Sequence, residues 1–522
     1  MTKQSKITIL FILVLAAIMR LYGIWWSLPD EDRLLSYSAD ESTIFLMLEG
    51  MNPSKLDFVP ELKYFQTTLQ VYIVGIGIKL ASWLGFVDVV NSREFYLSHP
   101  EEFGKMYLTG RIIACIFGIS TVYLVYLAGK GLWGEAAGII SAAFFSVIPL
   151  HVVHSKLNLF NVPLVFWWTL TFVFAVMLIK SPRKIWYVLG GIATGMAMGT
   201  KYNGILAAIS IITAHLLIEN SKLSMKTIKS LFSGKIILFY AVTLCSFLIV
   251  FPAAIFAPGQ MLKEASRILG FINAPYSDSH HLHSAIGWFS PIKACIFSVR
   301  LPVLLASLIG LSIAIFRRNK EDILLLANII PYYLVLAYAD NTSTSRAMPL
   351  MPFISILAAV AVINIGRWKQ WVVPFAAVVI FIYTFCCSIP YVLLFGKEDI
   401  RDTAGKWIVS NIPHGSEIGV PPAYYVFSPQ VLYKAYKGYS PYDYKVIVVN
   451  SEEELVHQLP PYVVISDIQT PNLEKEGLFS HYELEAHFSR PRVLLDSLYI
   501  GSDRCPDLNQ YPEGIRIYRI KS

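Results

Sequence analysis

Residues 36–72 read SYSADESTIFLMLEGMNPSKLDFVPELKYFQTTLQVY, and this polar interval follows the first hydrophobic run of the chain. It carries the adjacent carboxylates Asp40 and Glu41 and, further along, the basic and aromatic side chains of Lys63 and Tyr64. A carboxylate at the low-dielectric edge of a membrane can be positioned and tuned as a proton acceptor. The simpler interpretation is that the pair caps a short helix at the surface. The rest of the chain favours the first interpretation.

The composition of the chain is that of a polytopic membrane protein. Of its 522 residues, 55% are hydrophobic and 15% are charged, and the mean hydropathy is +0.54; these values do not describe a soluble enzyme. The net charge of +7 could suit nucleic acid, but the basic residues lie in short intervals between apolar runs, so we expect no nucleic-acid partner. The six cysteines include no CxxC pair and are interpreted as packing residues.

About eleven apolar runs are long enough to cross a bilayer, which takes roughly 17–25 residues each. The runs cover residues 7–26, 105–128, 136–152, 161–180, 185–200, 202–218, 236–256, 297–316, 321–339, 346–365 and 371–395. The first could be a signal peptide, but it lacks a small-residue cleavage site and continues into Trp25 and Trp26, so we expect a retained helix. The glycine-rich segment GGIATGMAMGT (residues 190–200) predicts close packing between helices.

The positive-inside rule gives the topology. The intervals KQSK, GKGLWGE, KSPRK, ENSKLSMKTIKSLFSGK, RRNKED and GRWKQ hold about fifteen Lys and Arg against about four Asp and Glu, so they are predicted to be cytoplasmic. A cytoplasmic N-terminus then requires that residues 64–86, which are interrupted by Gly75, Gly77 and Lys79, do not cross the membrane. We therefore predict a juxtamembrane helix over residues 64–86 and about eleven spans. The protein is expected in the cell membrane, with its C-terminus on the extracytoplasmic side.

Residues 397–522 change character, because the apolar runs shorten and elements alternate. The order is helix DIRDTAGKWIVSNI, strand SEIGV, strand YKVIVV, helix SEEELVHQL, strand YVVISD and strand IRIYRI. This alternation predicts a small α/β domain. The sequence thus predicts an α-helical transmembrane domain over residues 1–396, with a first outer loop at 27–104, and a soluble extracytoplasmic domain over 397–522.

The predicted topology places four basic residues near the outer ends of spans: Arg111, Lys201, Arg300 and Arg346. Basic residues at bilayer depth are costly and usually serve a partner. Together with the acidic loop they indicate a bound anion, and a lipid-linked phosphate fits, since Arg and Lys bind phosphoryl oxygens strongly. The alternative is that each side chain extends to the lipid headgroups.

The order of these features resembles the polytopic glycosyltransferases of the GT-C fold, specifically the protein O-mannosyltransferase-like group (family 39) and its aminoarabinose-transferase relatives. SADE in the first outer loop resembles the acidic catalytic motif of the family, and KYFQTTL resembles its Lys-Tyr-Pro-Pro-Leu-like stretch. GTKYNG resembles the Thr-Lys-Tyr turn, and SRAMPLMPFISILAA resembles the Arg-Tyr-x-x-Pro-x-x-Pro-like helix. WIVSNIPHGSEI resembles the opening of the small outer domain in many members.

The resemblance implies transfer of a sugar, with inversion, from a polyprenyl- or dolichyl-phosphate carrier to a protein, glycolipid or glycan acceptor outside the cytoplasm. Asp40 would be the general base, and Glu41 would orient it or the acceptor. Lys201 and Arg346, together with Arg111, would neutralise charge on the departing lipid phosphate. The implied substrate-binding set is Lys63, Tyr64, Arg111, Asn161, Lys201, Tyr202 and Arg346.

The sequence departs from the family pattern at two positions. Asn161 stands where an Asp usually precedes Val-Pro, and an amide cannot ionise, so a second carboxylate is in doubt. Gln66 is the best match to a Glu that binds metal in the aminoarabinose transferases. A divalent metal held by Asp278, His280, His281 and His283 stays an alternative to a merely polar loop, and no metal or other cofactor is assigned.

Two other classes compete with the glycosyltransferase interpretation. A lipid or glycan transporter or flippase would also be polytopic and basic inside, but it would more often carry inverted repeats and acidic residues in mid-membrane. A non-catalytic assembly or receptor protein with an outer α/β domain is the third class. It differs from an enzyme in showing no turnover of any lipid-phosphate sugar.

Overall fold

The computed structural model describes residues 2–52, 55, 57–60, 67–219, 229–273, 287–338, 344–365, 369, 371–422, 424–467, 481–500, 507 and 511–521. The chain divides into two compact units that do not follow chain order. The first, here the helical unit, comprises Met1–Leu21, Thr43–Ile76 and Ile112–Ile389. The second, here the mixed unit, comprises Tyr22–Ser42, Gly77–Arg111 and Pro390–Ser522. Residues of the first predicted outer loop therefore group with the C-terminal part of the chain.

The helical unit is built of helices that follow the apolar runs. Its long helices are α1 (Lys3–Leu21), α5 (Pro100–Trp133), α8 (Asn161–Lys180), α9 (Lys184–Thr200), α12 (Gly234–Val250), α14 (Pro258–Asn273), α16 (Leu301–Arg317), α17 (Lys320–Tyr338), α18 (Met351–Ile365) and α19 (Val372–Leu394). Its shorter helices are α2 (Ser42–Glu49), α3 (Leu69–Trp83), α6 (Glu135–Ser146), α7 (Pro149–His154), α10 (Ala208–Glu219), α13 (Ala253–Phe256) and α15 (Ser290–Val299). The turns η3 (Tyr202–Ala207), η4 (Gly287–Phe289) and η5 (Thr344–Leu350) are 3₁₀ helices. Helices α3, α5 and α19 continue into the mixed unit.

Each predicted apolar run contains a helix, so the helical fold is confirmed. Among the described residues, seven helices have the length and composition to cross a membrane. These are Lys3–Leu21, Pro100–Trp133, Asn161–Lys180, Tyr202–Glu219, Lys320–Tyr338, Thr344–Ile365 and Val372–Leu394. Others, such as α12 and α16, are apolar but have 17 residues. The number of about eleven spans stays a prediction.

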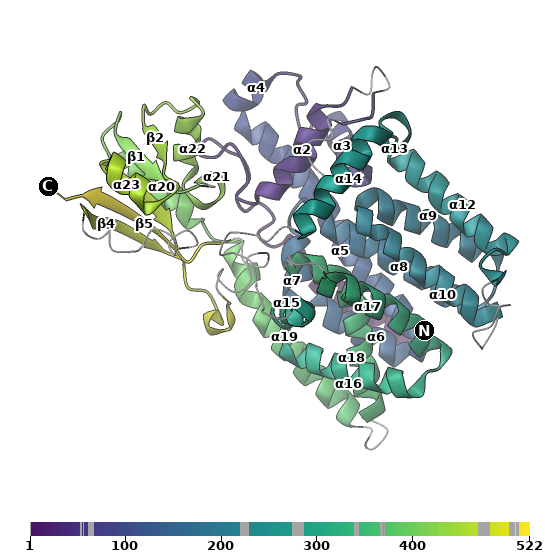
Figure 1. Ribbon diagram of the computed structural model, residues 1–522. Coiled ribbons are helices and arrows are strands. Elements are labelled where there is room, and N and C mark those ends of the chain that lie inside the picture. The colour runs from purple at the N-terminus through teal and green to yellow at the C-terminus, as the bar shows by residue number, and fades with distance from the viewer. Residues whose placement is uncertain are drawn as a thin grey trace. The chain divides into compact units, whose positions relative to one another are not determined.

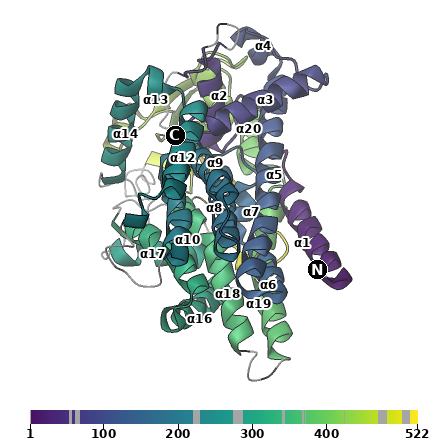
Figure 2. The same cartoon turned by 90° about the vertical axis from the view of Figure 1, so that its right-hand side faces the viewer.

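The glycine-rich segment packs as predicted. Helices α8, α9, α10 and α12 lie side by side (Figures 1 and 2), and α9 contacts both α8 and α12. A Cβ added at Gly195 would lie 2.6 Å from Ser246 Cβ, and one at Gly199 would lie 2.2 Å from Val250 Cγ2. These glycines are one helical turn apart, so they let the backbone of α9 approach α12 as small residues do in membrane helix pairs.

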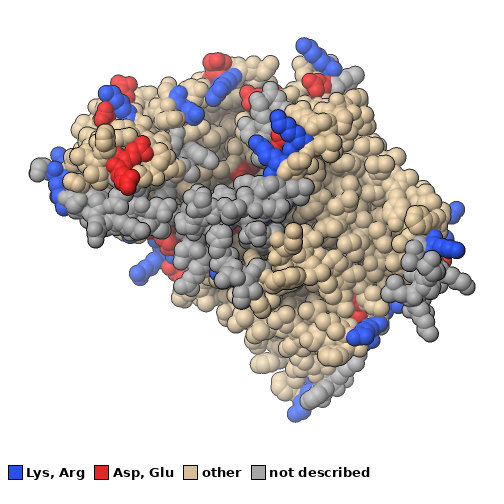
Figure 3. Space-filling view, in the orientation of Figure 1, with Lys and Arg blue, Asp and Glu red and all other residues tan. Residues whose placement is uncertain are grey.

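The outer surface of these helices is apolar. In Figure 3 the face over α8, α10 and α12 is almost entirely without charge, and the charged side chains lie toward its ends. Helix α12 exposes Ile237, Leu244 and Ile249. Large apolar surfaces of this kind are rare on soluble monomers and are expected against lipid. The chain is therefore an integral membrane protein.

The mixed unit contains the predicted small α/β structure. Its elements are η1 (Ala39–Glu41), α4 (Arg93–Ser98), α20 (Ile400–Asn411), β1 (Glu417–Val420), α21 (Tyr424–Phe427), α22 (Gln430–Tyr436), β2 (Lys445–Val448), α23 (Glu452–Gln458), β3 (Tyr462–Ser466), β4 (Tyr482–Ser489), η7 (Asp496–Leu498) and β5 (Gly514–Ile520). The six elements predicted between 399 and 520 are all confirmed. Strand β4 and the short helices α21 and α22 were not predicted.

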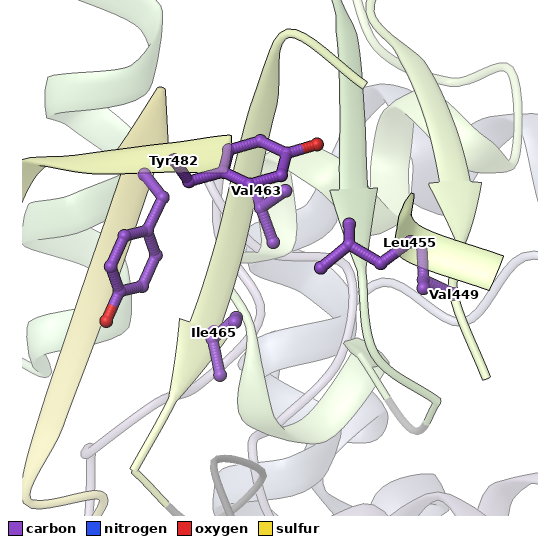
Figure 4. Packing of buried hydrophobic residues seen from close by; sticks show 6 residues of the cluster. Val449, Leu455, Val463, Ile465 and Tyr482 are labelled. Atoms are coloured by element: carbon purple, nitrogen blue, oxygen red, sulfur yellow. The ribbon is translucent and has the colours of Figure 1, made fainter. Parts of the chain in front are cut away.

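One five-stranded sheet organises this part, in the order β2-β1-β3-β5-β4. Strand β1 pairs parallel with both β2 and β3, whereas β5 pairs antiparallel with both β3 and β4. On one face Val463, Ile465 and Tyr482 pack with Leu455 of α23 and with Val449, as Figure 4 shows. Helix α20 packs against β4 and β5. These contacts hold α20 against the sheet.

Candidate active site

The two acidic residues of the SADE segment have opposite environments. Both belong to η1, which begins immediately after the extended residue Ser38. Asp40 is exposed, whereas Glu41 is completely buried. The tight 3₁₀ turn separates adjacent side chains, so one carboxylate faces outward while its neighbour points into the protein.

Glu41 is held by Arg111 in an ion pair between fully buried side chains. Arg111 Nε donates to Glu41 Oε1 at 2.9 Å and Nη2 donates to Oε2 at 2.6 Å. Ser36 Oγ also donates to Oε2, at 2.7 Å. A two-point contact of this kind fixes orientation as well as distance.

The remaining donors of Arg111 hold the loop backbone. Its Nη1 donates to the carbonyls of Ile24 and Trp26, at 2.8 and 2.6 Å, and Nη2 donates to Ser36 Oγ at 3.1 Å. A guanidinium has five N–H groups, so all five are engaged within the mixed unit. In this arrangement Arg111 joins α5 to the loop and has no donor left for a phosphate.

The other predicted residues that the structure describes lie in the helical unit. Lys201 directly follows the last residue of α9, and Asn161 begins α8. Lys201 Nζ donates to Asn161 Oδ1 at 2.9 Å. Because an amide is neutral, it orients the ammonium without cancelling its charge. Tyr202 is half-buried next to Lys201 and opens η3.

A buried tyrosine links the turn after Lys201 to the segment that carries Arg346. Asn203 Nδ2 donates to Tyr332 Oη at 3.1 Å, and Tyr332 Oη donates to the backbone carbonyl of Arg346 at 2.7 Å. The Tyr332 ring is 2% exposed and packs edge-on against Trp168 with centroids 5.0 Å apart. The structure therefore brings the segments of Lys201 and Arg346 together, although they are far apart in sequence.

Sequence reasoning missed Asn203 and Tyr332. Asn203 lies within the GTKYNG motif, so its position was a usable signal. Tyr332 follows Pro331 in the apolar helix α17 and looks like a packing residue until its hydroxyl partners are known.

Several predicted residues fall outside the described part of the chain. They are Lys63, Tyr64 and Gln66, and the possible metal ligands Asp278, His280, His281 and His283. Among the residues that are described, no group of three or more His, Cys, Asp or Glu side chains is arranged so that it could hold a metal ion. Asp40, Glu41 and Arg111 lie in the mixed unit, while Asn161, Lys201, Tyr202 and Arg346 lie in the helical unit.

Comparison with protein families gives a match over residues 73–261 to the family described as dolichyl-phosphate-mannose-protein mannosyltransferase. Over these residues the chain is similar to the protein mannosyltransferases. The match supports an enzyme of the glycosyltransferase class. The comparisons give no support to the transporter alternative.

A solved archaeal oligosaccharyltransferase shares the fold. The apo oligosaccharyltransferase of Archaeoglobus fulgidus matches with a TM-score of 0.52 and 12% identity over 88% of this chain and 69% of the archaeal chain. The same enzyme with an inhibitory peptide and a dolichol-phosphate gives 0.51 and 12%, over 89% and 69%. An aminoarabinose transferase of Cupriavidus metallidurans bound to undecaprenyl phosphate gives 0.49 and 13%, over 98% and 97%. No curated protein sequence matches.

Proposed function

We propose that this GT-C glycosyltransferase moves a sugar from a polyprenyl- or dolichyl-phosphate carrier to an acceptor hydroxyl on the extracytoplasmic face, with inversion at the anomeric carbon. The acceptor oxygen attacks the anomeric carbon, the bond from that carbon to the carrier phosphate breaks, and the acceptor proton passes to Asp40. The products are the glycosylated acceptor and the free lipid phosphate. The acceptor is a protein, glycolipid or glycan.

The observation that carries the proposal is the contrast between the two carboxylates of SADE. A general base must reach the proton that it removes, and Asp40 is exposed. Glu41 forms a buried ion pair with Arg111 and cannot reach a substrate without breaking that pair. Asp40 is therefore assigned as the base, and Glu41 and Arg111 are assigned to holding it in position.

Lys201 and Arg346 are assigned to the phosphate of the donor. Charge develops on the leaving phosphate as its bond to the sugar breaks, and preorganised cations at that point stabilise the transition state. The Lys201–Asn161 hydrogen bond and the link through Tyr332 preorganise the two segments. A dolichol-phosphate is bound by the archaeal oligosaccharyltransferase that shares the fold, which is consistent with a lipid phosphate as the carrier here.

Asp40→Asn tests the proposal. The change keeps size and hydrogen-bonding shape but removes the basic lone pair, so we expect at least a roughly 100-fold loss of kcat. The purified variant should bind the lipid-linked donor as the wild type does. Asp443→Asn is the matched control, since Asp443 is also an exposed aspartate of the mixed unit and should leave kcat unchanged. Turnover by Asp40→Asn within twofold of the wild type would remove Asp40 from the mechanism.

A further inference from the structure

Five side chains of the mixed unit form a polar network between the loop that precedes Asp40 and helix α20. Arg33 and Tyr37 come from the loop, and Asp399, Arg401 and Asp402 come from the start of α20. Tyr37 and Arg401 are each 1% exposed, Asp399 is 2% exposed and Asp402 is 8% exposed. Burial of so many polar groups is costly unless each is satisfied, so the contacts among them matter.

Asp402 is the centre of the network. Tyr37 Oη donates to Asp402 Oδ1 at 2.7 Å, and Arg33 forms an ion pair with the other oxygen. Both contacts cross from α20 to the loop, and Tyr37 and Asp402 are 365 positions apart. They are the kind of charge-assisted hydrogen bond that fixes two segments against each other.

Arg401 holds the Tyr37 ring in place. Its guanidinium lies 3.6 Å from the centroid of that ring, a cation–π contact. Its Nε and Nη2 each donate to the Asp399 carboxylate at 2.7 Å. Arg401 is thus oriented from α20 and covers the face of Tyr37, while the Tyr37 hydroxyl reaches Asp402.

Asp402 also lines two cavities, of about 360 and 270 Å³. Arg33 and Trp26 line the smaller one, and Arg401 and Lys406 line the larger one. Burial raises the pKa of Asp402 to about 6, with Arg33 acting in the opposite direction. Little solvent reaches the carboxylate, so it depends on Tyr37 and Arg33 as partners.

We propose that Tyr37 and Asp402 are positioning residues for the transferase reaction, through which the C-terminal domain sets the position of Asp40. Tyr37 precedes Asp40 by three residues and is anchored to α20, whereas Glu41 follows Asp40 and is anchored to Arg111 of α5. The proposed base thus lies on a short segment fixed at both ends by buried side chains. This inference rests on the proposed function.

Tyr37→Phe is the sharpest test, because it removes one hydroxyl and keeps the ring beneath Arg401. We expect kcat to fall about 10–100-fold, the range for a small misplacement of a reacting group, while the KM for a polyprenyl-phosphate sugar stays within twofold. Tyr444→Phe is the matched control. The Tyr444 hydroxyl donates to the carbonyls of Ile408 and Ile412, at 3.3 and 3.1 Å, so it contacts α20 without contacting the loop.

Asp402→Asn supplies a second variant that does not depend on the folding of the first. It should lower kcat at least as much as Tyr37→Phe, because a neutral amide is a weaker acceptor than a carboxylate. The double variant should lose less than the product of the two single losses, since both changes act on one shared hydrogen bond. Fully additive losses would overturn the proposal. So would a Tyr37→Phe enzyme with the kcat of Tyr444→Phe.

Tyr37→Phe made in an Asp40→Asn background separates this inference from the proposed function. If Tyr37 acts through Asp40, adding Tyr37→Phe should leave the residual activity of Asp40→Asn within twofold. A further tenfold loss there would show that Tyr37 supports the fold generally and would overturn the positioning role. An inactive Asp40→Asn beside a normal Tyr37→Phe would remove only this inference, whereas a normal Asp40→Asn would remove the proposed function itself.

Discussion

At the scale of single residues, Glu41 and Asp40 differ in the free-energy cost of placing a charged carboxylate in the folded protein. The Glu41 carboxylate is buried away from water, and Arg111 compensates its charge. In turn, Glu41 is the carboxylate that compensates the buried guanidinium of Arg111. Breaking such a buried pair leaves one charge uncompensated. The exposed Asp40 carboxylate has no comparable cost.

Glu41→Gln should therefore act on folding. We expect the free energy of unfolding to fall by about 3–5 kcal/mol, because Arg111 stays charged and buried. Asp40→Asn should change it by no more than about 0.5 kcal/mol, as for other surface substitutions. Unfolding of both purified variants in the same detergent measures the difference. A Glu41→Gln protein that unfolds like the wild type but has no turnover would exchange the roles of the two carboxylates.

At the scale of elements, α17 connects the two parts of the proposed phosphate site. Tyr332→Phe removes the hydroxyl that joins Asn203 to the Arg346 carbonyl. We expect kcat/KM for the lipid donor to fall about 10-fold or more, since the Lys201 and Arg346 segments would lose their relative positions. Tyr333→Phe is the control, because this neighbour on α17 donates instead to the Trp288 carbonyl at 2.5 Å. Equal effects of the two changes would contradict the role of Tyr332.

Elements that follow one strong pattern were predictable from the sequence. The long apolar runs gave the helices, and apolar stretches between turn residues gave β1, β2, β3 and β5. Strand β4, Tyr482–Ser489, has the sequence YELEAHFS. Its two glutamates interrupt the apolar pattern that marks the other strands, so the sequence did not predict it. It is an edge strand that pairs with β5, so its formation depends on a neighbour more than on its own residues.

At the scale of the whole molecule, the grouping of the first outer loop with the C-terminal part of the chain was not predictable. This grouping depends on contacts such as the Tyr37–Asp402 hydrogen bond. The local sequence around a buried tyrosine does not predict which distant residue it will contact. The SADE segment, by contrast, was recognisable by its motif. The sequence thus located the proposed base and Glu41 beside it, but not Tyr37 and Asp402.

The topology of the first outer loop follows from the contacts of Arg111. The loop after α1, at Ile24 and Trp26, and the segment at Glu41 both lie within hydrogen-bonding distance of Arg111 on α5. The chain between Glu41 and Arg111 therefore leaves and returns to one place, so it crosses the membrane an even number of times. Helix α3, Leu69–Trp83, has 15 residues, fewer than the roughly 20 that a span needs, and a single crossing by α3 would break this parity.

Reporters fused near residue 95 and near residue 450 should therefore lie on the same side of the membrane. Both positions belong to the mixed unit, and the clustering of Lys and Arg in the intervals between other spans predicts that this side is extracytoplasmic. A reporter in the interval around Lys180–Lys184, where three basic residues lie close together, should give the opposite signal and serves as the control. A cytoplasmic signal at 95 with an external one at 450 would mean that α3 crosses after all, which the five hydrogen bonds of Arg111 could not accommodate.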